Sequence, residues 1–268
     1  MDRRLLTISA PVTAKAAVQE PAKMHTKGKS TVPWRMIVSF VVYLVLIPLV
    51  IFIGVKLFAD RRYHIVSMII AFLVCVPFFI GFEKGKTGAR ELVVIAVMTA
   101  ISVLGRLIFA PIPGFKPVTA IVIITGIAYG MQAGFLTGAL SAIVSNIFYG
   151  QGPWTPFQMF VWGFLGLLAG LLFRRGQEPN AVVLILIGVI GGILFSVMMD
   201  IWSVLNIDGT WNWSRYLALL ASSLPFMAIY AVSNVVFLLL LTKPFLQKLN
   251  RVKDKYGLFA ARIELNEP

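Results

Sequence analysis

The stretch "ELVVIAVMTAISVLGRLIFA", residues 91–110, decides the fold class of this chain. A transmembrane helix needs about 20 mostly apolar residues, and this run has that length and character. Similar runs occur at 36–57, 65–82, 117–130, 131–149, 156–173, 181–202 and 216–241. The sequence therefore predicts an all-α integral membrane protein with a helix at each run. The run at 117–130 is short and flanked by glycine, so we expect it to be tilted, broken or packed inside the bundle.

Composition supports a membrane location. Hydrophobic residues make up 59% of the chain, charged residues 13%, and the mean hydropathy is +0.87. Such a chain buries its apolar surface in lipid. The net charge of +13 would suit nucleic acid, but most Lys and Arg residues lie in the two tails and the loops 83–90 and 174–180. This distribution indicates cytoplasmic termini at the cell membrane, contact with anionic lipid and no nucleic-acid partner.

Residue types divide the chain into four parts. Residues 1–33 are basic without a long apolar run, and we expect a disordered cytoplasmic tail. Residues 34–87 carry two plain apolar segments, predicted to be an N-terminal two-helix addition. Glycines and polar residues enter the spans from residue 88, so 88–242 is predicted to be a six-helix functional core, followed by a basic cytoplasmic tail at 243–268. The basic loop 56–64 would lie outside, unless the first two segments form a re-entrant hairpin.

The sequence offers little for catalysis. "GFEKGKTG", residues 81–88, resembles a phosphate loop, but three residues separate its first two glycines where the motif needs four. One cysteine, Cys75, excludes an internal disulfide. The two histidines, His25 and His64, lie away from the polar spans, so no catalytic set or metal cluster can be drawn. We expect no enzymatic activity and no cofactor, and uphill transport would need a partner or an ion gradient.

Small residues recur at helical spacing. Gly126, Gly130, Gly134 and Gly138 follow one another at steps of four, and Ala96 and Ala100 share that spacing in the 91–110 run. Small residues let membrane helices approach closely. Packing within the bundle is one interpretation, and a docking face for another membrane protein is the other.

Two charges lie within predicted spans. Each costs at least about 2.5 kcal/mol at the centre of a helix. Arg106 either reaches the lipid headgroups or pairs with Asp200. A stand-alone ion-coupled transporter would need such groups deep in the membrane, so that class stays open. An integral membrane enzyme would need a catalytic constellation, and the sequence shows none.

Three loops on the predicted outer side gather aromatic and amide residues: "APIPGFKPVT", "FYGQGPWTPFQ" and "SVLNIDGTWNWSR". An interfacial aromatic belt is one explanation. Aromatic walls with a few amides also suit a neutral, ring-bearing solute. Pro156 favours a helix start that places Gln158 and Trp162 on one face, and the first loop has the proline and glycine content of a shaped lid. We expect the solute contacts to come from Phe115, Lys116, Asn146, Gln151, Trp154, Gln158, Trp162, Asp200, Trp202, Asn206 and Trp211.

The chain resembles the substrate-binding S components of energy-coupling factor (ECF) vitamin transporters over residues 89–170. The most specific parts of this resemblance are "FKPVTA", "SNIFYGQGPWTPFQM" and the Ala96-xxx-Ala100 pair. The resemblance extends over most of 89–241. It implies a six-helix core in which Ala96 and Ala100 pack against a transmembrane T component and outer loops close over a vitamin. It also implies that two partner ATPases supply the energy. The two N-terminal helices depart from this pattern.

The same resemblance implies a substrate. "GQGPWTPFQM" is most similar to S components assigned to cobalamin (vitamin B12) or its precursors. Another ring-bearing nutrient, of the benzimidazole or deazapurine type, is the alternative within the family.

Overall fold

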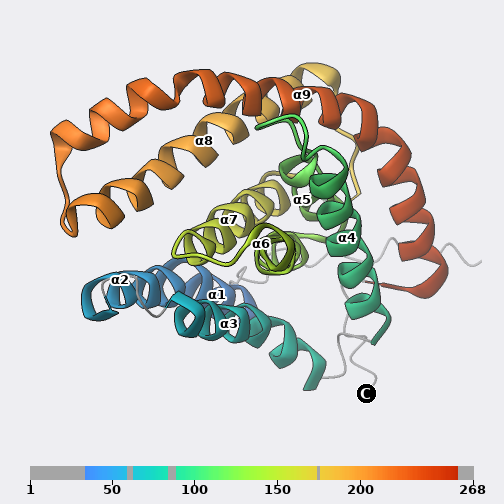
Figure 1. The fold of residues 1–268 in the computed structure, drawn as a ribbon. Coiled ribbons are helices and arrows are strands. Elements are labelled where there is room, and N and C mark those ends of the chain that lie inside the picture. Colours follow the sequence, from blue (N-terminus) through green and yellow to red (C-terminus); the bar gives the residue numbers. More distant parts are fainter. Residues whose placement is uncertain (1–33, 59–62, 84–88, 174–175, 259–268) are drawn as a thin grey trace, which may run out of the picture. The chain divides into compact units, whose positions relative to one another are not determined.

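The computed structural model describes residues 34–58, 63–83, 89–173 and 176–258, and the regular elements in these ranges are helices (Figure 1). The all-α prediction is confirmed. The elements are α1 (Trp34–Val41), the π-helix η1 (Val42–Leu46), α2 (Ile47–Phe58), α3 (Tyr63–Glu83), α4 (Ala89–Ile108), α5 (Val118–Tyr129), α6 (Met131–Tyr149), α7 (Thr155–Leu172), α8 (Ala181–Asp208) and α9 (Trp213–Tyr256). The predicted tail 1–33 lies outside the described residues.

Length and composition let six helical stretches of the described residues cross a membrane: Met36–Lys56, Ala89–Ile108, Met131–Tyr149, Thr155–Leu172, Ala181–Asp208 and Trp213–Tyr256. The short run expected at 117–130 is α5, and every residue of this helix is buried. It contacts α4, α6, α7 and α9. A helix surrounded by others on all sides can be uniformly apolar and need not match the bilayer thickness.

The last two helices are longer than the sequence indicates. α8 continues to Asp208 and α9 begins at Trp213, so the expected outer loop 203–215 shrinks to a turn around Gly209, whose φ is +66°. Asn212 caps α9 by accepting a hydrogen bond from the Arg215 backbone N–H. At its other end α9 runs through Tyr256, beyond the expected boundary at 242, because its last turns pack against α5. There Leu246 is buried, and the Tyr129 hydroxyl donates to the Leu249 carbonyl at 3.2 Å.

Glycines bring α5, α6 and α7 into backbone contact. The chain reverses between α5 and α6 at Gly130, whose φ of +96° favours glycine. A Cβ atom on Gly126 would lie 2.3 Å from the Gly166 carbonyl oxygen, and one on Gly134 would lie 2.4 Å from that same oxygen. A Cβ on Gly138 would meet the α7 backbone equally closely. The glycine spacing therefore serves packing within the bundle.

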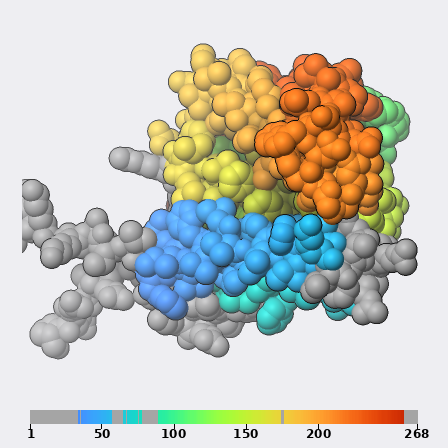
Figure 2. Space-filling view, turned by 90° about the vertical axis from the view of Figure 1, so that its left-hand side faces the viewer, coloured from blue at the N-terminus to red at the C-terminus, as the bar shows by residue number. Residues whose placement is uncertain are grey.

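The N-terminal helices cover α6 and α7. The Tyr43 ring stacks on the Phe135 ring with centroids 4.0 Å apart, and Gln132 Nε2 donates to Ser39 Oγ at 2.6 Å. Figure 2 shows these helices beside the yellow surface of α7. Their other face is open, since Met68 and Phe72 on α3 are largely exposed, as expected for a lipid-facing surface. The addition thus extends the apolar core of the bundle.

Candidate substrate site

One buried amide joins three helices of the core. Asn146, near the end of α6, is 0% exposed. Its Oδ1 accepts from Arg106 Nη1 at 2.9 Å, and its Nδ2 donates to Thr155 Oγ1 and to Gln158 Oε1, each at 2.9 Å. Arg106 Nη1 also donates to Ser145 Oγ. A satisfied network of this kind fixes the relative positions of α4, α6 and α7.

The turn between α6 and α7 frames this network. Gly150 has a φ of +91°, and Pro156 lies in the first turn of α7, as the sequence predicts. Thr155 Oγ1 donates to Gln151 Oε1 at 3.1 Å, and Gln151 Nε2 donates to the Ile143 carbonyl at 2.8 Å. Three of the expected amides, Asn146, Gln151 and Gln158, therefore belong to one connected cluster.

Arg106 neither reaches the headgroups nor pairs with Asp200, so both expectations for it are wrong. It is 9% exposed, and its guanidinium lies 4.5 Å from the Tyr149 ring centroid and 5.2 Å from that of Trp162. Asp200 instead accepts a hydrogen bond from Ser223 Oγ at 2.7 Å. The reason is direction: Arg106 faces α6 and α7, and Asp200 faces α9.

The loop before α5 is anchored on α9. The Lys116 backbone N–H donates to Ser233 Oγ at 2.8 Å, and that hydroxyl donates to the Lys116 carbonyl at 3.1 Å. The Phe115 ring lies 5.0 Å from the Phe237 ring. This expected lid is thus tied down by main-chain hydrogen bonds and a ring contact, both at its α5 end.

The Lys116 ammonium lies among three rings. Its Nζ is 4.9 Å from the ring centroid of Tyr230, 5.5 Å from that of Phe195 and 5.6 Å from that of Trp162. Burial and, to a smaller extent, the positive charge of Arg106 lower the pKa of Lys116 to about 7. Cation–π contacts contribute about 0.5–2 kcal/mol, whereas taking an ammonium out of water costs several kcal/mol, so the rings offset only part of that cost.

Neither cation has an anionic partner in the part of the chain that the structure describes. Within the described ranges, the ion pair joins Arg215 and Asp208 at 3.0 Å, and no carboxylate pairs with Arg106 or Lys116. Two positive charges therefore flank one side chain, Trp162, under one end of the bundle.

Four aromatic residues complete the site. Trp162 is 0% exposed, stacks on Phe195 at 5.4 Å between centroids, and its indole Nε1 has no hydrogen-bond partner among the described residues. Trp154 on the turn meets Trp202 on α8 edge to face at 6.0 Å. The Trp202 Nε1 likewise finds no acceptor in the described part of the chain. Indole N–H groups buried in this way are donors available to a ligand.

Two expected residues lie apart from this cluster. Asn206 and Trp211 are exposed, and the Trp211 ring packs against those of Trp213 and Tyr216, each with centroids 5.0 Å away. They are separated because α8 and α9 extend as a helical hairpin where the sequence suggests a folded-back loop. Sequence reasoning missed Ser145, Thr155, Phe195, Tyr230 and Ser233. Thr155 sits beside Pro156 in the quoted turn and could have been found there; the others carry no local signal.

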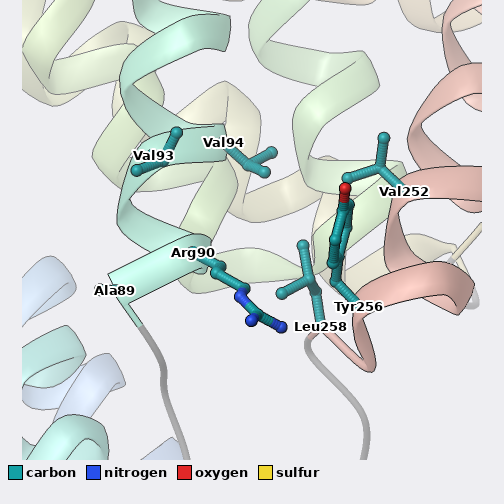
Figure 3. A pocket seen from close by; sticks show the side chains of 7 residues that line it. All are labelled: Ala89, Arg90, Val93, Val94, Val252, Tyr256 and Leu258. Carbon is teal, nitrogen blue, oxygen red and sulfur yellow. The ribbon is translucent and has the colours of Figure 1, made fainter.

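Two cavities lie among the described residues away from the polar cluster. One of about 210 Å³ has an apolar lining from α2, α7 and α8: Pro48, Ile51, Phe52, Phe157, Phe160, Val161, Met198, Ile201 and Leu205. The other, of about 450 Å³, lies at the far end of α4 from Arg106, where Arg90 and Tyr256 face each other across the α4–α9 groove (Figure 3). Among the described residues no group of His, Cys, Asp and Glu side chains could hold a metal ion.

The expected partner-binding alanines lie on an open surface. Ala96 and Ala100 are exposed, as are Val93, Val97 and Leu104 on the same side of α4. The opposite side of this helix carries Arg106 into the buried network. α4 thus links the polar cluster to a smooth apolar face.

An apolar bundle of membrane-spanning length with a polar cluster buried beneath one end is the architecture of a multi-pass membrane protein. Residues 86–251 match the family model described as the ECF-type riboflavin transporter, S component, and the chain belongs to this family. The match begins after α3, so the N-terminal helices lie outside it. No curated protein and no solved structure matches the chain.

Proposed function

We propose that this protein captures a ring-bearing vitamin as the substrate-binding subunit of an ATP-driven ECF uptake transporter. The family match carries this proposal, and the Asn146-centred cluster beneath aromatic walls supports it. In this account the termini are cytoplasmic and the cluster faces the outer side of the cell membrane, as the positive-inside distribution favours.

A vitamin of the riboflavin type is the leading substrate. The family model is described by riboflavin, and a flat ring can stack on an indole face such as that of Trp154 or Trp202. Cobalamin is the second candidate, favoured by the resemblance of the 148–158 turn and not by the family match. The family match therefore decides the order of the two candidates.

The aromatic residues and the amides of the site have different roles in binding. Trp154, Trp162 and Trp202 supply flat apolar surface with few rotamers to freeze. Gln158 has its oxygen committed to Asn146, which leaves its amide N–H groups for the solute. Because the amide cluster is already fully connected, binding requires little reorganisation of polar groups, which favours tight binding.

The energy would come from partners. We propose that a T component docks on the Ala96–Ala100 face of α4, where small side chains permit close helix approach, and that two ATPases act through it. Movement of α4 would then reach the site directly, because Arg106 on this helix holds the amide cluster.

Co-purification and transport test the proposal together. The full chain, tagged and expressed in its own cells, should retain a T component and two ATPases, and vesicles with this complex should take up labelled vitamin only with ATP. Uptake by the purified chain alone, driven by an ion gradient, would instead establish the stand-alone transporter.

A further inference from the structure

We infer that the site takes an anionic form of its vitamin, one whose carboxylate or phosphate binds between Lys116 and Arg106 beside Trp162. This inference rests on the proposed function and names the chemical class of its substrate. It departs from the neutral solute that the aromatic and amide residues suggest by themselves.

The first argument is the one-sided chemistry of the site. Arg106, Lys116 and the Trp162 indole N–H are all donors, and a donor cannot satisfy a donor. Arg106 donates hydrogen bonds from one nitrogen, Nη1, to Ser145 and Asn146. The Lys116 ammonium makes ring contacts only, and the Trp162 Nε1 has no partner among the described residues. A ligand that completes this set must bring acceptors, and a carboxylate or phosphate brings several together.

The second argument is charge. Two cations, one on buried Arg106 and one on half-buried Lys116, flank the same indole ring at 5.2 and 5.6 Å from its centroid. Like charges held close together repel, and removal from water strengthens that repulsion. In the part of the chain that the structure describes, no carboxylate compensates either one. An incoming anion removes both penalties at once, so it gains more here than a neutral group does.

The third argument concerns what the fold requires of Lys116. The loop is held by the Lys116 main chain, whose N–H and carbonyl both bond to Ser233. Its side chain is therefore not needed for anchoring. The residue is half-buried, so the ammonium remains within reach of a ligand that enters over the loop.

Matched pairs of neutral and anionic ligands test the inference. Equilibrium binding to the purified full chain is measured for riboflavin against riboflavin 5′-phosphate, and for cobalamin against its monocarboxylate, with inorganic phosphate as a competitor. We expect the anionic member of a pair to bind at least about tenfold more tightly than the neutral member. Lys116→Met should reduce this ratio about tenfold or more, and Lys116→Arg should retain most of it. Lys243→Met, at an exposed site on α9, is the matched control.

The outcomes separate the two claims. If neutral members bind and anionic members bind no better, the anionic inference is overturned and vitamin capture stands. A ratio that persists in Lys116→Met also overturns the inference. If no member of either pair binds, the proposed function for these ring-bearing vitamins fails and the inference fails with it. Competition by inorganic phosphate that Lys116→Met weakens supports the anion site independently of the vitamin.

Discussion

Replacement of Asn146 by alanine should be the most damaging single amide change in this protein. The side chain makes one hydrogen bond to a charged donor, Arg106, and two to neutral groups, all at 2.9 Å. Net contributions are about 1.5–3 kcal/mol for a charged bond and about 0.5–1.5 kcal/mol for a neutral one. Because the terms share a network and do not simply add, we expect a loss of about 2–5 kcal/mol in the free energy of unfolding.

Asn206→Ala is the matched control, since Asn206 is also an asparagine late in a helix but is exposed. Unfolding of both variants in detergent, followed by loss of helicity against added denaturant, gives the two free energies. Asn206→Ala should change stability by less than about 0.5 kcal/mol. Equal effects of the two substitutions, or an Asn146→Ala variant as stable as the parent, would refute the role assigned to the buried network.

Three further predictions address docking, packing and charge. Ala96→Trp or Ala100→Trp should abolish ATP-driven uptake by the complex and leave vitamin binding by the isolated chain intact; normal uptake by both would exclude this face as the docking surface. Gly166→Ala should prevent stable folding, because its Cβ would lie 2.4 Å from a backbone oxygen of α6. Gly191→Ala is the control, since its Cβ would lie 3.5 Å from the nearest atom and the variant should fold normally. Monodisperse elution in detergent measures folding of both variants. The pKa of Lys116 is about 7, below the ordinary value of 10.5, so the ammonium is lost as pH rises and affinity for an anionic vitamin should fall between pH 7 and 9; a flat profile would argue against an ionic contact.

Much of the fold could be predicted from the sequence, because hydropathic length limits where membrane helices begin and end. The run 131–149 became α6 with the same bounds, and 156–173 became α7 within a residue. The ends of α8 and α9 could not be placed in this way. Polar residues such as Asn206 and Asp208 are compatible with a loop and also with a helix that projects beyond the bilayer. The helix cap at Asn212, seen in the structure, shows that the second arrangement is the one formed.

The candidate site was predictable where its residues are close in sequence. Gln151, Trp154 and Gln158 lie in one turn, and their grouping is visible in the sequence alone. Arg106 was recognised as costly, but the sequence offered only the lipid headgroups or Asp200 for it, since an opposite charge is the simplest assumption for a buried arginine. The structure surrounds it with neutral oxygens and rings from α6 and α7, and such neighbours leave no charge pattern in the sequence.

The most direct test of the account is equilibrium binding of a vitamin panel to the purified chain. One ring-bearing vitamin should bind tightly. Trp154→Ala and Gln158→Ala should each weaken that binding by about tenfold or more, which corresponds to about 1.4 kcal/mol. Trp34→Ala, at a residue 60% exposed on α1, should bind like the parent. If no vitamin in the panel binds, or if the Trp154 and Gln158 variants bind as tightly as the parent, the assignment of this site to vitamin capture is contradicted.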